Sequence, residues 1–179
     1  SRAFYTNTLG PFLEKLTNIS GLEVALPMNT GAEAVETAIK AARRWAYKTK
    51  KVEADKAEII VVEGNFHGRT TTIISFSTDN ESREGFGPYT PGFKIIKYNN
   101  LGSLKDAITK NTAALLVEPI QGEAGIIIPD IEWLPEVRKI CTENNILLIL
   151  DEIQSGLGRT GKMFAFEHSS IKPDGLILG

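Results

Sequence analysis

The sequence contains few of the residues that support several common kinds of functional site. Its 179 residues include one cysteine, Cys141, and two histidines, which stand in unrelated segments at positions 67 and 168. A single cysteine excludes an internal disulfide, and the two histidines support neither a metal site nor a Ser-His-Asp arrangement. Cys141 stands in an amphipathic helical pattern, which predicts a small buried residue and suits a reducing compartment.

Long apolar runs and an excess of one charge are also missing. The 20 Lys and Arg residues against 22 Asp and Glu give a formal net charge of -2. The sequence therefore lacks the excess of positive charge that would indicate binding to nucleic acid or to an anionic membrane. No apolar run approaches the length that crosses a bilayer. No targeting segment is visible. Because the sequence starts at Ser1 and ends at Gly179 in a strand-like pattern, we expect it to be part of a larger protein.

The sequence does contain an alternation of helical and strand patterns. A 3.6-residue apolar stripe over 31–48 predicts a long helix, with Glu36 and Lys40 spaced for an ion pair. Further helices are predicted over 103–110 and 134–144, and apolar strands over 59–62, 94–96, 113–117, 146–150 and 176–178. Continuous apolar strands separated by helices predict an α/β fold with a central, mostly parallel sheet and helices on both faces.

Polar residues cluster where these segments join, and ligands of such sheets bind outside the carboxyl ends of the strands. The first cluster, Asn29 to Ala34, opens the long helix. Gly31 and the free N–H groups of the helix start favour an anion, whereas Thr30 and Glu33 match a capping box. Both interpretations can hold together.

Two further clusters follow predicted strands. Phe66 stands between glycines, where it could stack on a flat ligand. Arg69 could hold a carboxylate with the paired N–H groups of its guanidinium. A plain loop is the alternative. Glu118 and Glu123 lie five residues apart after the strand 113–117. This spacing allows an acid/base pair or a solvated turn, and the sequence does not decide between them.

The fourth cluster is Asp151 to Gln154, directly after the most apolar strand. A carboxylate at the edge of the core is costly unless it is paired, so we expect a cationic group to face Asp151. A helix N-cap or a structural pair with an arginine is the alternative. The turn over 155–161, which follows at once, favours a functional interpretation.

Taken together, the four clusters resemble the class III, fold-type I pyridoxal-phosphate aminotransferases over nearly the whole chain. The most specific match is Asp-Glu-Ile-Gln-Ser-Gly-Leu-Gly-Arg-Thr-Gly at 151–161, followed by Glu-Pro-Ile-Gln-Gly-Glu at 118–123. Asn-Thr-Gly-Ala-Glu-Ala at 29–34 and Phe-His-Gly-Arg-Thr at 66–70 support it. The resemblance implies that the chain is part of the large, cofactor-binding domain of such an enzyme.

The resemblance also implies contacts with pyridoxal 5'-phosphate, and no metal. It assigns the phosphate to the backbone of Gly31 and Ala32, the two ring faces to Phe66 and Ile153, the protonated ring nitrogen to Asp151, and the ring hydroxyl to Gln154. The catalytic role falls to Asp151, because an acid there keeps the ring cationic and able to accept electrons.

Three residues are assigned to the substrate. Arg69 is expected to grip a substrate carboxylate, Glu118 to support ring and substrate, and Glu123 to pair with an arginine later in the full protein. Within the class, Gly-Glu-Ala-Gly at 122–125 and the segment 85–93 look most like the ornithine aminotransferases. Phe-His-Gly-Arg at 66–69 also suits acetylornithine enzymes, and 4-aminobutyrate aminotransferases are a further alternative.

The resemblance places other parts of the enzyme outside residues 1–179. We expect the Schiff-base lysine directly beyond Gly179 and a small C-terminal domain after it, so the 179 residues alone are expected to be inactive. A homodimer in the cytoplasm, or in the mitochondrial matrix of a eukaryote, is expected, with amino acids and 2-oxo acids as substrates. A decarboxylase or aminomutase on the same fold, and a non-catalytic binding or structural domain, are the alternatives. No Gly-x-Gly-x-x-Gly joins a first strand to a helix, which disfavours a nucleotide-binding fold.

Overall fold

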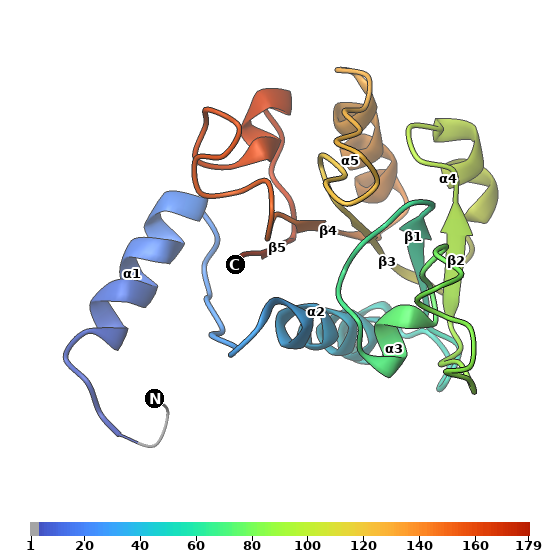
Figure 1. Cartoon of the computed structure of the whole chain (residues 1–179), viewed down its shortest axis with the longest axis horizontal. Helices are drawn as coiled ribbons and strands as arrows, with labels where there is room; N and C mark the ends of the chain where they lie inside the picture. Colours follow the sequence, from blue (N-terminus) through green and yellow to red (C-terminus); the bar gives the residue numbers. More distant parts are fainter. Residues whose placement is uncertain (1–3) are drawn as a thin grey trace.

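The computed structural model describes residues 4–179, and its centre is a five-stranded parallel sheet (Figure 1). The strands lie in the order β2-β1-β3-β4-β5, and each neighbouring pair is parallel. Their bounds are Glu58–Val62 (β1), Phe93–Ile96 (β2), Thr112–Val117 (β3), Leu147–Asp151 (β4) and Gly175–Ile177 (β5). The predicted α/β fold with a central parallel sheet is confirmed.

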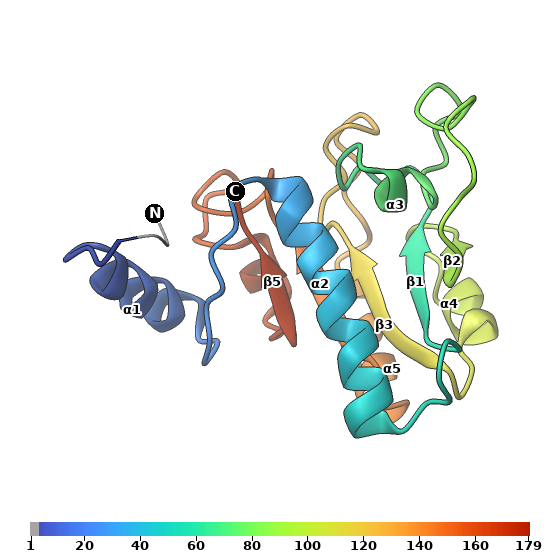
Figure 2. The same cartoon turned by 90° about the horizontal axis from the view of Figure 1, so that it is seen from below.

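Helices cover both faces of the sheet (Figures 1 and 2). One face carries α2 (Gly31–Trp45), its π-helical continuation η1 (Ala46–Lys50) and α3 (Thr71–Ile74). The other carries α4 (Leu101–Ala107), α5 (Trp133–Glu143) and the 3-10 helix η2 (Ala165–Ser169). The first helix, α1 (Leu9–Ser20), stands apart on the side of β5 and buries no residue. None of the helices within residues 4–179 combines the length and apolar character needed to cross a membrane.

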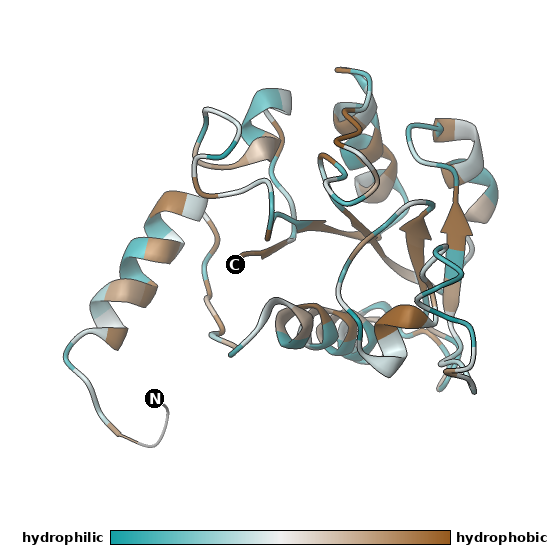
Figure 3. Cartoon of the chain, viewed as in Figure 1, coloured by the Kyte–Doolittle hydropathy of each residue, from teal (hydrophilic) through white to brown (hydrophobic). Residues whose placement is uncertain are grey.

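Each face of the sheet has its own hydrophobic core, because successive strand residues point to opposite sides. Ile59 and Val61 of β1 pack with α2, whereas Ile60 and Val62 pack with α5. This double burial explains the unbroken apolar runs in the sequence, and the strands are mostly drawn in the hydrophobic colour in Figure 3. Cys141 is buried in α5 as predicted, and burial raises the pKa of its thiol to about 12.

The structure departs from the sequence pattern at several points. The helix predicted from 103 begins at Leu101 because Asn100 caps it, its side chain accepting a hydrogen bond from the Ser103 N–H at 2.8 Å. The helices α1, α3 and η2 were not predicted from the sequence. The predicted Glu36–Lys40 ion pair is not among the three ion pairs of residues 4–179; Glu36 instead accepts a hydrogen bond from Thr70.

The strand order brings three loops together. The chain runs from β1 outward to β2 and then returns to β3, β4 and β5, so the order reverses between β1 and β3. Ligands of open parallel sheets bind at such a switch point, outside the carboxyl ends of the strands. Because β1, β3 and β4 are neighbours, the loops that leave them lie side by side, and these loops carry three of the four predicted clusters.

The buried side chain of Glu152 ties the end of β4 to η2. Its carboxylate accepts hydrogen bonds from the N–H groups of Ala165 at 2.6 Å and Phe166 at 2.9 Å, and the residue is 1% exposed. Burial raises the pKa of Glu152, and the two N–H donors act against that rise. Glu152 therefore satisfies the first N–H groups of a helix that has no other side-chain cap.

We predict that Glu152→Ala lowers the free energy of unfolding by about 3 kcal/mol, because it leaves two buried N–H groups without an acceptor. Urea unfolding followed by circular dichroism measures the change. Glu143→Ala, at an exposed position at the end of α5, is the control and should change stability by less than about 0.5 kcal/mol. Equal effects of the two substitutions would contradict the structural role of Glu152.

Candidate active site

A cleft of about 130 Å³ opens where the loops after β1, β3 and β4 meet the start of α2. Its walls come from all four segments: Gly31, Ala32, Phe66, His67, Gly68, Glu118, Ile120, Asp151, Ile153, Gln154 and Ser155. The structure thus brings all six predicted cofactor residues and Glu118 into one cavity. Arg69 and Glu123 are not among the residues that form its walls.

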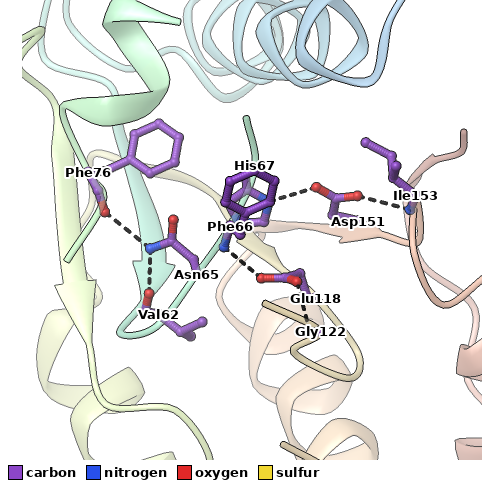
Figure 4. Close-up of polar contacts among 9 residues, drawn as sticks. All are labelled: Val62, Asn65, Phe66, His67, Phe76, Glu118, Gly122, Asp151 and Ile153. Carbon is purple, nitrogen blue, oxygen red and sulfur yellow. Dashed lines mark hydrogen bonds and ion pairs between the residues drawn. The ribbon is translucent and has the colours of Figure 1, made fainter. Parts of the chain in front are cut away.

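Asp151 ends β4 and lies at the base of the cleft, 5% exposed. Its Oδ1 accepts a hydrogen bond from the N–H of Ile153 at 3.1 Å, and its Oδ2 lies 2.7 Å from Nδ1 of His67 (Figure 4). The imidazole is thus the group that faces Asp151, where the sequence predicted a cationic partner. Since a carboxylate oxygen can accept more than one hydrogen bond, both oxygens keep acceptor capacity toward the cleft.

His67 is the site residue that the sequence analysis missed. Its side chain is 0% exposed, and its ring packs against Phe76 with the ring centroids 6.0 Å apart. Nε2 has no hydrogen-bond partner within the described part of the chain, although the residue lines the cleft. Its position directly after Phe66 in a strand-exit loop was the available signal. Residues 4–179 contain no group of three or more His, Cys, Asp or Glu side chains that could hold a metal ion.

Glu118 fixes the backbone of the aromatic residue that precedes His67. Its Oε1 accepts a hydrogen bond from the Phe66 N–H at 2.9 Å, and its Oε2 accepts one from the Gly122 N–H at 3.4 Å (Figure 4). Burial raises the pKa of Glu118, and the charge of Asp151 adds to the rise, while His67 and the two N–H donors lower it.

Glu123 has a different environment from Glu118, which does not support the acid/base pair that their spacing allowed. It is exposed and accepts a hydrogen bond from Nε2 of Gln154 at 2.8 Å. The oxygen of the same Gln154 amide packs against Gly122, where there is no room for a side chain. Gln154 therefore joins the loop after β4 to the loop after β3 at the mouth of the cleft.

Arg69 also lies at the mouth. It is exposed, and its guanidinium carbon lies 5.6 Å from the centre of the Phe66 ring. A planar guanidinium held over an aromatic face keeps its N–H groups free for a second partner. The side chain is therefore available to an anionic group that approaches the cleft from solvent.

The start of α2 closes the cleft on the remaining side. Thr30 accepts a hydrogen bond from the Glu33 N–H at 3.1 Å, and Glu33 accepts one from the Asn29 N–H at 2.9 Å, so the predicted capping arrangement is present. The N–H groups of Gly31 and Ala32 precede the first intrahelical hydrogen bonds and remain available to an anion. A Cβ on Gly31 would lie 2.7 Å from Cδ1 of Ile153, so glycine is needed here because Ile153 packs on it.

We predict that Glu118→Gln removes the loss of stability that the ionisation of Glu118 causes as the pH rises. Because the folded state holds the Glu118 proton more tightly than the unfolded chain, its ionisation lowers stability as pH rises above about 4.3. The free energy of unfolding of the variant, relative to the original protein, should therefore rise between about pH 4 and the raised pKa and then level off. Urea unfolding at several pH values tests this. Glu53→Gln, at an exposed position, is the control for the same substitution.

Comparison with known proteins agrees with this geometry. The family described as Aminotransferase class-III matches residues 1–179. An ornithine aminotransferase from Brevibacillus brevis is 62% identical over all 179 residues, which span 45% of that protein.

Solved structures give the same result. An ornithine aminotransferase from Toxoplasma gondii, crystallised with oxidised glutathione and showing partial occupancy of PLP at its active site, is 45% identical with a TM-score of 0.97; the match covers 99% of this chain and 42% of that one. An acetylornithine aminotransferase from Elizabethkingia anophelis is 42% identical with a TM-score of 0.83. The match covers 100% of this chain and 41% of that one.

The chain thus spans less than half the length of these relatives, but the family match extends over its whole length. The match includes every loop that contributes to the cleft. The chain belongs to the class-III aminotransferase family.

Proposed function

We propose that the protein containing this chain is a pyridoxal-phosphate-dependent aminotransferase. It would transfer the δ-amino group of L-ornithine to 2-oxoglutarate, giving glutamate-5-semialdehyde and glutamate. The observation that carries the proposal is the buried Asp151 carboxylate at the base of a cleft between Phe66 and Ile153. The choice of ornithine is supported by the segments at 85–93 and 122–125 and by the 62% identity to a relative of that name.

The residues of the cleft fit pyridoxal phosphate. This cofactor has a flat pyridine ring, a ring nitrogen that carries a proton and a phosphate group. The cleft offers the Phe66 ring and the Ile153 side chain to the ring, the Asp151 carboxylate to the protonated nitrogen, and the free N–H groups of Gly31 and Ala32 to the phosphate. Gln154 also lines the cleft and is the amide available to the ring hydroxyl.

When bound, the protonated ring accepts the electron pair released at the carbon that bears the transferred amino group. The contribution of this chain is electrostatic. Asp151, removed from water and held by two hydrogen bonds, would keep the proton on the ring nitrogen throughout the reaction. Glu118 holds the Phe66 backbone, so the aromatic wall cannot shift without breaking a partly buried hydrogen bond.

The mouth of the cleft is proposed to recognise the substrates. Arg69 would bind a substrate carboxylate with its guanidinium fork. Glu123 would pair with an arginine from a later part of the full-length protein when ornithine is bound and release it for glutamate. The exposed position of Glu123, held only through the Gln154 amide among the described residues, is compatible with such an exchange.

We further propose that the 179 residues are part of the large domain, with the Schiff-base lysine and the small domain in the remaining sequence. The relatives are more than twice as long as the chain, which supports this. A homodimer and a cytoplasmic location, or the mitochondrial matrix in a eukaryote, are proposed on the family resemblance alone.

The proposal predicts a specific change in the absorption spectrum of the full-length protein loaded with pyridoxal phosphate. L-Ornithine should shift the band of the bound cofactor to that of the amino form, and 2-oxoglutarate should restore it. A band that only acetylornithine shifts would favour the second candidate, an acetylornithine aminotransferase, which the similarity to the Elizabethkingia anophelis structure supports. A band that only 4-aminobutyrate shifts would favour a 4-aminobutyrate aminotransferase. A folded protein that takes up no cofactor would overturn the proposal.

We predict that Arg69→Lys raises the KM for 2-oxoglutarate about tenfold, because a lysine keeps the charge but loses the paired N–H groups of the fork. Steady-state kinetics of the full-length protein give the value. Arg44→Lys, at an exposed position in α2 on the far side from the cleft mouth, should leave KM unchanged. An unaltered KM for the Arg69 variant would remove Arg69 from the substrate site.

A further inference from the structure

We infer that His67 is a positioning residue that holds the Asp151 carboxylate in a fixed orientation through its Nδ1–H. This inference rests on the proposed function, since the orientation matters only if Asp151 binds the cofactor ring. His67 comes from the loop after β1, whereas Asp151 ends β4, and 84 residues separate them in the sequence. Their contact is therefore a product of the fold and not of local structure.

The geometry makes this hydrogen bond strong. Nδ1 and Oδ2 are 2.7 Å apart, and the two side chains are 0% and 4% exposed. A hydrogen bond to a carboxylate is strengthened by the charge, and water does not compete for it at this burial. Because the ionised carboxylate can only accept, the hydrogen lies on Nδ1, which leaves the unpartnered Nε2 as the remaining ring nitrogen.

Three contacts fix the imidazole itself. The preceding residue, Phe66, is tied to Glu118 through its backbone N–H, and the ring of His67 packs against Phe76. The next residue, Gly68, adopts a φ of +121° and lies so close to Ala32 that a Cβ would be 3.0 Å from the Ala32 Cβ. The loop after β1 is thus held between the loop after β3 and the start of α2, on both sides of His67.

The Ile153 N–H alone would leave the carboxylate free to rotate. It binds Oδ1 from two residues further along the chain, a local contact that any Asp at this position could make. His67 supplies the second, non-local contact, on the other oxygen. Two donors on two different oxygens determine the plane of a carboxylate, and one donor does not. His67 therefore decides how Asp151 presents itself to the cleft.

Two substitutions of matched shape test the inference in the full-length protein. Asparagine and leucine both branch at Cγ and carry two δ atoms, but only His67→Asn places an N–H where Nδ1 stands. His67→Leu should weaken pyridoxal phosphate binding about tenfold, because the Asp151 carboxylate loses its fixed orientation toward the ring nitrogen. His67→Asn should restore binding to near the original value. His168→Leu, at an exposed histidine, is the control for replacing a histidine with leucine.

A second measurement, hydrogen exchange, is made on the protein without cofactor. If His67 orients the carboxylate, His67→Leu should speed hydrogen exchange at the Ile153 amide, whose acceptor becomes free to rotate, while His67→Asn should not. The absorption spectrum of the loaded protein at several pH values adds a readout of the ring proton. The band should change at lower pH in the leucine variant than in the asparagine variant, because a misplaced carboxylate stabilises the protonated ring less.

The outcomes separate the inference from the proposed function. If the original protein takes up no pyridoxal phosphate, the proposed function is wrong, and exchange at Ile153 still reports on the orientation of Asp151. If the original protein binds the cofactor and the two variants bind it equally, whether tightly or weakly, the hydrogen bond has no positioning role. Tight binding by the asparagine variant together with weak binding by the leucine variant supports the inference.

Discussion

The cost of placing a carboxylate at the end of a buried strand controls the arrangement of this site. Asp151 is the last residue of β4 and is 5% exposed, so its charge must be compensated by nearby donors. One donor, the Ile153 N–H, is local, whereas the other, His67, comes from the far side of β3. The sheet has to form with β1, β3 and β4 in that order before Asp151 gains its second partner. Stability of the core and geometry of the site are thus linked through one buried hydrogen bond.

The dipeptide Phe66–His67 extends the same constraint to the rest of the cleft. The backbone of the first residue is bound by Glu118 from the loop after β3, and the side chain of the second binds Asp151 at the end of β4. One short segment therefore connects the exits of three neighbouring strands. The aromatic wall and the carboxylate at the bottom of the cleft are held by adjacent residues, so their relative positions are fixed. This arrangement suits a cofactor with a flat ring and a charged nitrogen.

The base and the mouth of the cleft differ in the way their charges are held. At the base, Asp151, Glu118 and His67 are buried and bonded to one another or to the backbone. At the mouth, Arg69 and Glu123 are exposed, where charges are screened by water and salt. A rigid base with an adaptable mouth agrees with the proposed function, in which one cofactor remains in place while two substrates of different charge alternate.

The sequence by itself determined the fold class, because strands buried on both faces must be apolar at every position, and it determined most element positions through periodicity. It also located Asp151, Phe66, Glu118 and the start of α2, since polar residues at strand exits and caps at helix starts are local signals. Only the tertiary structure decided which of these residues meet. Nothing local indicated that His67 pairs with Asp151 across 84 residues, or that one of the two glutamates after β3 is buried and the other exposed. Strand order sets those contacts, and strand order depends on the packing of the whole sheet, which no local pattern contains.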